Sequence, residues 1–187
     1  MNYHNITKED MNNGDGLRVV LWTAGCSHHC KGCQNPQTWD PEGGIPFDDE
    51  AFEELRNELS KDYVSGITFS GGDPLFCDNR SAIEHLIRTI RKEFGDTKTI
   101  WLWTGFLWED IKELPFINLI DIIVDGPFIL EQRDVSLKWK GSPNQRVIDV
   151  KNSLIKGEVV LHCDDKKDNE FVSEQLFDAN AASCCDD

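Results

Sequence analysis

The sequence predicts an α/β fold, namely an incomplete, open β/α barrel with a mainly parallel sheet. Apolar runs typical of buried strands alternate along the chain with amphipathic stretches typical of helices. This alternation favours a parallel sheet with helices packed against it. The chain has 187 residues, whereas a complete eight-fold barrel takes about 250, so only part of a barrel can form.

The predicted strands are short runs rich in β-branched and aromatic residues, and glycine follows several of them closely. In parallel α/β sheets the functional loops follow the carboxyl ends of the strands. We therefore expect the site where the first four strands end. The predicted strands cover 17–24, 66–70, 99–104, 119–125, 146–150 and 158–162.

Helices are expected between these strands, and their ends carry capping signals. Asp48 is the expected N-cap of the first helix. Ser81 and Glu84 have the spacing of a capping box at the start of the second helix, and Gly95 ends that helix. The predicted helices cover 49–61, 82–94 and 107–114.

The charge of the chain excludes one class of partner. Its net charge is −15, with 34 acidic and 19 basic residues, and a protein that binds phosphate backbones needs a basic face. We therefore expect no nucleic-acid partner. The start of the chain lacks the apolar core of a signal peptide. The longest apolar stretches, such as 100–108, fall well short of the roughly 20 residues that span a bilayer, so a cytoplasmic protein without a membrane segment is expected.

Two regions differ in composition. Residues 1–163 contain all the predicted strands and helices and form the expected domain. Residues 164–187 contain eight acidic residues and two lysines and show little apolar periodicity. We expect this second region to be a flexible acidic tail.

Three of the seven cysteines lie within eight residues, directly after the first predicted strand. A disulfide framework is disfavoured, because the chain has no secretion signal and an odd number of cysteines. Such local density seldom serves packing alone, so a metal centre is favoured. The three residues are Cys26, Cys30 and Cys33.

Two kinds of metal centre fit this loop. A tetrahedral zinc site would need a fourth ligand, such as His28, His29 or the distant pair His162 and Cys163. A [4Fe–4S] cluster that is held by three cysteines leaves one iron without a protein ligand, whereas electron-transfer clusters normally use four. The open iron can bind a substrate or cofactor directly.

The CxxxCxxC spacing from Cys26 to Cys33 resembles the signature of the radical S-adenosylmethionine (SAM) enzymes. In that family the open iron binds the amino and carboxylate groups of SAM. A second element, SGGDP at 70–74, resembles the family's GGEP element, with Asp73 in place of the more usual glutamate. Taken alone, this sequence also has the chemistry of a simple tight turn.

Longer stretches resemble one subgroup, the activating proteins of the anaerobic (class III) ribonucleoside-triphosphate reductases. The resemblance implies an open barrel of radical SAM type. It implies an enzyme that cleaves SAM and generates a glycyl radical on the large subunit of the reductase, with an electron donor such as a flavodoxin. It covers about residues 1–150, and its matching stretches include MNYHNI at 1–6, IWLWTG at 100–105, VDGPF at 124–128 and WKGSPNQRVID at 139–149.

The resemblance also implies roles for individual residues. Cys26, Cys30 and Cys33 would hold the [4Fe–4S] cluster. Gly32, Cys33 and Gln34 would contact the adenine side of SAM, although the family usually has an aromatic residue where this chain has Gln34. Gly72 would contact the methionine side. No catalytic acid, base or nucleophile is assigned, because the cofactors carry the chemistry.

Some alternatives stay open at this point. The chain could activate a different glycyl-radical enzyme, or it could be a zinc-binding adaptor without enzymatic activity. Arg133 and Arg146 are candidates for the SAM carboxylate, although ordinary surface pairing is favoured for both.

Overall fold

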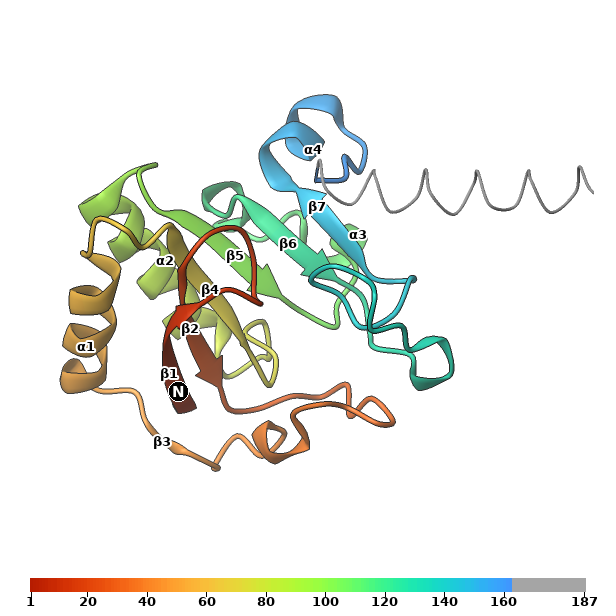
Figure 1. Cartoon of the computed structure of the whole chain (residues 1–187), viewed down its shortest axis with the longest axis horizontal. Helices are drawn as coiled ribbons and strands as arrows, with labels where there is room; N and C mark the ends of the chain where they lie inside the picture. Colours follow the sequence, from red (N-terminus) through yellow and green to blue (C-terminus); the bar gives the residue numbers. More distant parts are fainter. Residues whose placement is uncertain (163–187) are drawn as a thin grey trace, which may run out of the picture.

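The computed structural model describes residues 1–162. The expected acidic tail, 164–187, lies outside the described residues, as does Cys163. Seven strands form one mixed sheet in the order β3-β1-β2-β4-β5-β6-β7 (Figure 1). The strands are β1 (Asn2–Asp10), β2 (Arg18–Thr23), β3 (Ile45–Pro46), β4 (Gly66–Gly71), β5 (Thr99–Trp103), β6 (Ile122–Asp125) and β7 (Arg146–Asp149).

The middle of the sheet is parallel, as the sequence predicts. Strand β2 pairs with β4, β4 with β5, and β5 with β6, all in parallel. The edges are antiparallel: β1 pairs with β2 and with β3, and β7 pairs with β6. The register places Thr23 opposite Gly71, so β2 and β4 end side by side and their following loops start together.

Strands β1 and β3 have no strong signal in the sequence. Strand β1 is mostly polar, and among its residues Tyr3 and Ile6 are the buried ones. Strand β3 is two exposed residues long. Such edge strands are held by backbone pairing with a neighbour rather than by an apolar pattern, and that pairing is a long-range property of the fold.

All three predicted helices form among the described residues, but their ends differ from the prediction. Helix α1 (Asp49–Leu59) begins at the predicted cap, where the Asp48 side chain accepts from Ala51 N. Helix α2 (Arg80–Phe94) starts two residues early, so the predicted Ser81–Glu84 capping box is wrong. The N-cap of α2 is Asn79, whose amide donates to the carbonyl oxygens of Ala24 and Asp73 instead of capping the helix.

Helix α3, strand β6 and the last predicted strand are shorter than predicted, and one helix was not predicted. Helix α3 (Trp108–Ile111) is a single turn, and residues 117–119 form a 3-10 turn before β6. The strand predicted over 158–162 is reduced to one bridge between Leu161 and Ile148. Helix α4 (Val150–Lys156) follows β7 and was not predicted. Among residues 1–162, no helix combines the length and apolarity needed to cross a membrane.

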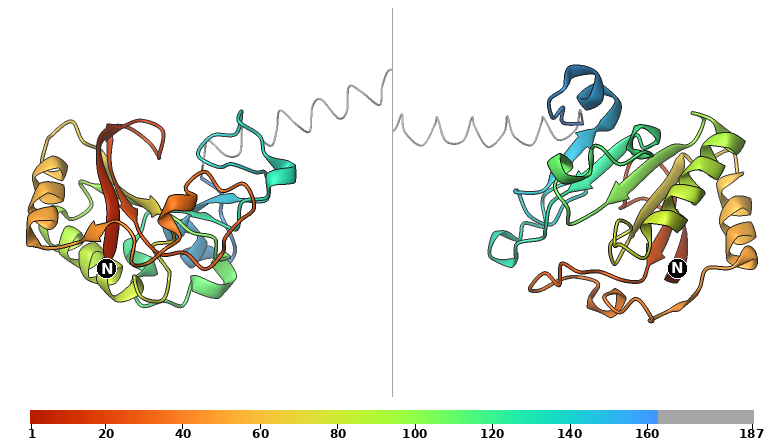
Figure 2. Two further views of the ribbon diagram at one scale, coloured as in Figure 1. Left: turned by 90° about the horizontal axis from the view of Figure 1, so that it is seen from below. Right: turned by 180° about the vertical axis from the view of Figure 1, so that it is seen from behind.

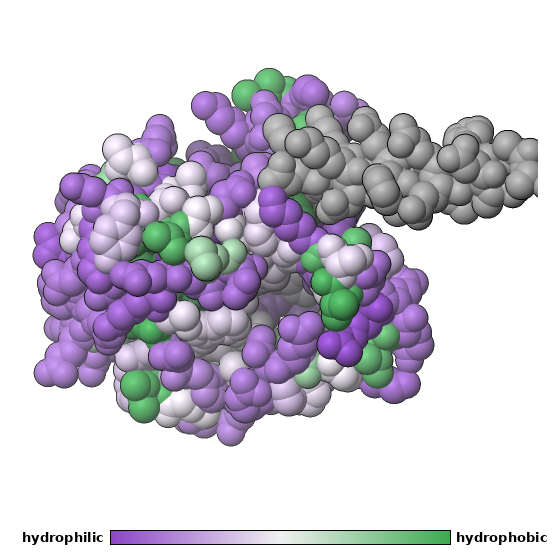
Figure 3. All heavy atoms as spheres, in the orientation of Figure 1, coloured by the Kyte–Doolittle hydropathy of each residue, from purple (hydrophilic) through white to green (hydrophobic). Residues whose placement is uncertain are grey.

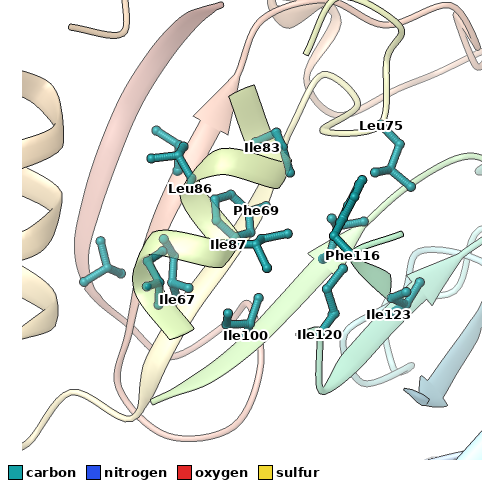
Figure 4. Packing of buried hydrophobic residues seen from close by; sticks show 14 of the residues in the cluster. Ile67, Phe69, Leu75, Ile83, Leu86, Ile87, Ile100, Phe116, Ile120 and Ile123 are labelled. Carbon is teal, nitrogen blue, oxygen red and sulfur yellow. The ribbon is translucent and has the colours of Figure 1, made fainter. Parts of the chain in front are cut away.

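One face of the sheet packs against helices through an apolar core. In Figure 2, seen from behind, α2 lies across this face. Alternate residues of the central strands point toward it, and Figure 4 shows them interleaved with side chains of α2 and of the segment before β6. The fully buried members include Leu21, Ile67, Phe69, Ile83, Ile87, Ile100, Leu102 and Ile123.

The other face has a smaller and partly polar core. Trp101 packs there with Val124 and Val147, while Arg18 is fully buried beside it and lies 5.3 Å from the Trp101 ring centroid. The Arg18 guanidinium donates to Thr68 Oγ1 (2.8 Å), to Thr99 Oγ1 (2.8 Å) and to the carbonyl oxygens of Asp15, Ile67 and Thr99. Burial lowers the pKa of this guanidinium, and its hydrogen bonds offset part of the desolvation cost.

Candidate functional site

The three cysteines lie on one loop that follows β2 and folds back on itself. The backbone N–H of Gly25 donates to Thr38 O (2.8 Å), and that of Cys26 donates to Trp39 O (3.1 Å). Within the loop, Cys33 N donates to Cys30 O (3.0 Å). These bonds close residues 25–39 into a compact loop beside the carboxyl ends of the central strands.

This loop forms one wall of a cavity of about 600 Å³. The thiols of Cys26, Cys30 and Cys33 all line it and are half-buried, and none of them forms a disulfide. The opposite wall comes from the ends of β4, β5 and β6 and from residues 128–145, which we call the outer loop. Figure 3 shows a hollow in this face of the molecule, surrounded by a mostly polar surface.

The cavity contains most, but not all, of the residues singled out from the sequence. Gly72 and Gln34 line it together with the cysteines. Gly32 is absent from its lining and faces the outer loop, where a Cβ on Gly32 would lie 2.7 Å from the Leu130 side chain. Arg133 also lines the cavity.

The Gly71–Asp73 turn packs tightly against the cysteine loop. Gly72 N donates to Thr23 O and Asp73 N donates to Gly25 O, both at 2.8 Å. A Cβ on Gly72 would lie 2.4 Å from Gly25 O and 2.7 Å from Thr38 O. The backbones approach so closely that only glycine fits at this position.

Asp73 makes more contacts than a simple tight turn would require, so it is a further candidate for a functional residue. Its side chain is buried. Oδ1 accepts from Leu75 N (2.8 Å) and from Thr104 Oγ1 (2.9 Å), and Oδ2 accepts from Gly105 N (3.0 Å). The Leu75 contact is the Asx turn that the Gly-Gly-Asp-Pro sequence favours, while the contacts to Thr104 and Gly105 connect the ends of β4 and β5.

The two histidines between the cysteines have different surroundings. His28 is half-buried, and its Nε2 lies 2.9 Å from Asp73 Oδ2. Its ring also packs edge-on against Phe106, with the centroids 4.6 Å apart. His29 is exposed and stacks on Trp39 at 4.8 Å. In the structure both rings are thus in contact with other side chains of the protein.

The surroundings of the half-buried Cys26 thiol change its pKa. Burial raises the pKa of the Cys26 thiol, and the carboxylate of Asp73 adds to this, whereas the N–H groups of His28 and His29 oppose it. Within residues 1–162, no group of three or more His, Cys, Asp or Glu side chains is arranged so that it could hold a metal ion. Cysteine thiolates are nevertheless the ligands of iron–sulfur clusters, and three cysteines line this one cavity.

The outer loop is fastened to the rest of the molecule by polar contacts. Gln145 Nε2 donates to Gly126 O (3.1 Å), and Asn144 Nδ2 donates to Pro127 O (2.8 Å). Ile129 N donates to Ser142 Oγ (3.1 Å). These bonds hold the two ends of the outer loop together, so that the stretches VDGPF and WKGSPNQRVID both contribute to one wall of the cavity.

Arg146 is occupied by an ion-pair network, so the sequence-based preference for ordinary pairing is confirmed for this residue. Its Nε donates to Asp125 Oδ1 (3.1 Å), and its two terminal nitrogens reach both carboxylate oxygens of Glu109 at 3.1 and 2.9 Å. Hydrogen bonding to Arg146 lowers the pKa of Glu109. Asp125 also accepts from Trp108 N (2.8 Å), which anchors α3 at the end of β6.

Comparison with known proteins adds to this geometry. The family described as "4Fe-4S single cluster domain" matches residues 12–148. The chain is 43% identical over 149 residues to the anaerobic ribonucleoside-triphosphate reductase-activating protein of Enterobacteria phage T4, covering 79% of this chain and 93% of the relative. It is 39% identical over 151 residues to the protein of the same name from Escherichia coli K12, covering 79% and 97%.

A third relative of that name, from Haemophilus influenzae, is 38% identical over 149 residues, with 78% of this chain and 96% of the relative covered. The matched region contains the cysteine loop, the Gly71–Asp73 turn and the whole outer loop. By this similarity, the chain belongs to the family of anaerobic ribonucleoside-triphosphate reductase-activating proteins and contains a 4Fe-4S single-cluster domain.

Proposed function

We propose that this chain is an iron–sulfur enzyme that reductively cleaves SAM and generates the glycyl radical on the anaerobic ribonucleoside-triphosphate reductase. The observation that carries the proposal is that Cys26, Cys30 and Cys33 line the same cavity as the Gly71–Asp73 turn. Relatives at 38–43% identity are named for activating that reductase.

In this proposal the three cysteine thiolates hold a [4Fe–4S] cluster with one iron open to SAM. When bound, the reduced cluster supplies one electron, which splits SAM into methionine and a 5′-deoxyadenosyl radical. This radical would take a hydrogen atom from a glycine Cα of the reductase, with 5′-deoxyadenosine and the glycyl radical as the products. A low-potential donor such as a flavodoxin would reduce the cluster again after each electron transfer. The reducing cytoplasm suits both the free thiols and the cluster.

The residues of the chain position SAM and exclude water from it. Gly72 N already donates to Thr23 O, so its carbonyl oxygen is the group that accepts from the amino group of SAM. The backbone of Cys33 and Gln34 takes the adenine side, and Gly32 supports that segment from behind, against Leu130. The exposed Gln34 replaces ring stacking with polar contacts, so we expect weaker adenine binding than an aromatic residue would give.

The shape of the molecule suits a protein substrate. We propose that the sheet and its helices correspond to an open barrel of radical SAM type, which leaves one side of the cavity accessible to a loop of the reductase. The outer loop forms the rim on that side. It is connected to the cysteine loop by the Lys31–Glu131 ion pair (2.9 Å).

The direct test is electron paramagnetic resonance of the reductase after anaerobic incubation with the reconstituted chain, SAM and dithionite. We expect a glycyl-radical signal that requires SAM and is lost in the Cys30→Ala variant. A reductase with its target glycine changed to alanine is the matched control. SAM cleavage without a radical on the reductase would indicate a different glycyl-radical target. Bound zinc with no cluster absorbance would indicate an adaptor.

A further inference from the structure

The contacts of Asp73 connect three segments that are far apart in sequence. Its carboxylate accepts from Leu75 N, just after β4, and from Thr104 Oγ1 and Gly105 N, just after β5. The remaining neighbour is His28 of the cysteine loop, at 2.9 Å. A buried carboxylate depends strongly on each such contact, because water does not reach it.

The His28 ring fits into a space shaped for it. Its Nε2 is buried and lies beside Asp73 Oδ2, although the ring does not present its N–H to that oxygen in full hydrogen-bond geometry. Phe106 packs edge-on against one side of the ring. A Cβ on Gly105 would lie 2.4 Å from the ring, so a side chain at position 105 would force the ring out.

We propose that Asp73 and His28 are positioning residues that hold the cysteine loop against the carboxyl ends of β4 and β5. His28 lies between Cys26 and Cys30, so its position constrains the backbone that carries both thiols. The same carboxylate fixes the turn that carries Gly72. One buried group thereby sets the separation between the cluster side and the SAM side of the cavity.

The effect of Asp73 and His28 on the cluster site rests on the proposed function, whereas the contact between His28 and Asp73 that holds the cysteine loop does not. The test is therefore a measurement on the full-length chain before any iron is added. Hydrogen–deuterium exchange of peptides that cover residues 24–39 reports opening of the cysteine loop. Peptides from α2 report global folding and serve as the internal reference.

The informative variants form a double-mutant cycle. We expect His28→Gln to speed exchange in residues 24–39 about tenfold, because the variant loses the packing of the ring against Phe106 and its close contact with the buried carboxylate. We expect Asp73→Asn to have an effect at least as large. In the Asp73→Asn background, His28→Gln should add nothing further.

His29→Gln is the matched control, because His29 lies on the same loop between the same two cysteines but contacts Trp39 instead. We expect its exchange to stay within about twofold of wild type. Additive effects of His28→Gln and Asp73→Asn, or equal effects of His28→Gln and His29→Gln, would overturn the proposal.

A second variant covers the case in which Asp73→Asn fails to fold. Gly105→Ala leaves the carboxylate in place but displaces the His28 ring, so it should reproduce the His28→Gln exchange pattern. Unchanged exchange in Gly105→Ala would contradict the proposed fit of the ring. Iron content after reconstitution then distinguishes a role in holding the loop from a role in cluster assembly. Faster exchange with full iron uptake would support the loop contact and contradict a role in cluster assembly.

Discussion

The two faces of the sheet are built in different ways. The helix-covered face is apolar, with fully buried side chains from strands and helices interleaved in one cluster. The other face, with the carboxyl edge of the strands, combines a few tryptophans with a buried arginine, a buried aspartate and many hydrogen bonds from loops. The first face stabilises the fold, while the second shapes a cavity.

This difference has a consequence for how each face responds to change. An apolar core loses stability with each removed methylene group, but neighbouring side chains of similar size tolerate substitution. A polar arrangement depends on complete pairing, because a buried group left without its partner is costly. Substitutions on the helix-covered face should therefore affect global stability, and those at the carboxyl edge should mainly affect the cysteine loop.

The largest effect is expected in the apolar core. Phe69 is fully buried between β4 and the helices, so Phe69→Ala should lower the free energy of unfolding by about 3–5 kcal/mol. Urea unfolding followed by circular dichroism measures this. Val135→Ala is the control, because Val135 is 82% exposed on the outer loop and should change stability by less than about 0.5 kcal/mol. Equal effects would remove the distinction between the two regions.

The next effect concerns the buried arginine on the opposite face. Arg18→Met removes the donors for three backbone carbonyl groups while keeping much of the side-chain volume. We expect a loss of about 2–3 kcal/mol in the free energy of unfolding, from acceptors left without partners. An Arg18→Met variant as stable as wild type would show that the cost of burying the cation cancels the value of its hydrogen bonds.

A smaller and more local effect is expected at the Gly71–Asp73 turn. Gly72→Ala places a Cβ against Gly25 O and Thr38 O, and overpacking of this kind costs about 1–3 kcal/mol. Gly95→Ala is the matched control, because Gly95 has a φ of +58° but open space around it. We expect both variants to be less stable, while only Gly72→Ala loses iron uptake on reconstitution. Equal iron uptake by Gly72→Ala and Gly95→Ala would show that the Gly71–Asp73 turn does not contribute to the cluster site.

The smallest effect is electrostatic. Pairing with Arg146 lowers the pKa of Glu109 below its ordinary value of 4.5, so the folded state binds this proton less tightly than the unfolded state. The stabilisation is therefore present above pH 4.5 and disappears as the pH falls through the lowered pKa. Because Glu109 is half-exposed, Glu109→Gln should cost only about 0.5 kcal/mol at pH 7.

The matching measurement is the difference in urea midpoint between wild type and Glu109→Gln at pH 7 and at pH 3. We expect this difference to be smaller at pH 3 than at pH 7. A difference that persists unchanged at low pH would mean that Glu109 contributes through packing rather than charge.

The sequence was informative wherever local patterns decide the structure. The four central strands and Asp48 as the cap of α1 were predicted, because apolar runs and capping residues are local signals. Strand β1 was missed because its pairing with β2 is long-range. The capping box of α2 was wrong because the chain uses Asn79 to tie the end of β2 to the Gly71–Asp73 turn, and no pattern within the helix shows this.

The same limit applies to the site. The spacing of the cysteines and the SGGDP segment predicted which residues meet in the cavity. The contact between His28 and Asp73 joins residues far apart in the chain, and the hydrogen bonds of Asp73 to Thr104 and Gly105 depend on how β4 and β5 end side by side. The proximity of Gly32 to Leu130 is likewise a long-range contact that the loop sequence does not show.

The central claim is that the cysteine loop and the Gly71–Asp73 turn together form a site for SAM cleavage. The most direct measurement is the formation of 5′-deoxyadenosine by the anaerobically reconstituted chain with dithionite and SAM, beside the Cys30→Ala variant. We predict 5′-deoxyadenosine from the wild type alone. A wild-type chain that carries its cluster and yet yields no 5′-deoxyadenosine, or no more than Cys30→Ala, would contradict the claim.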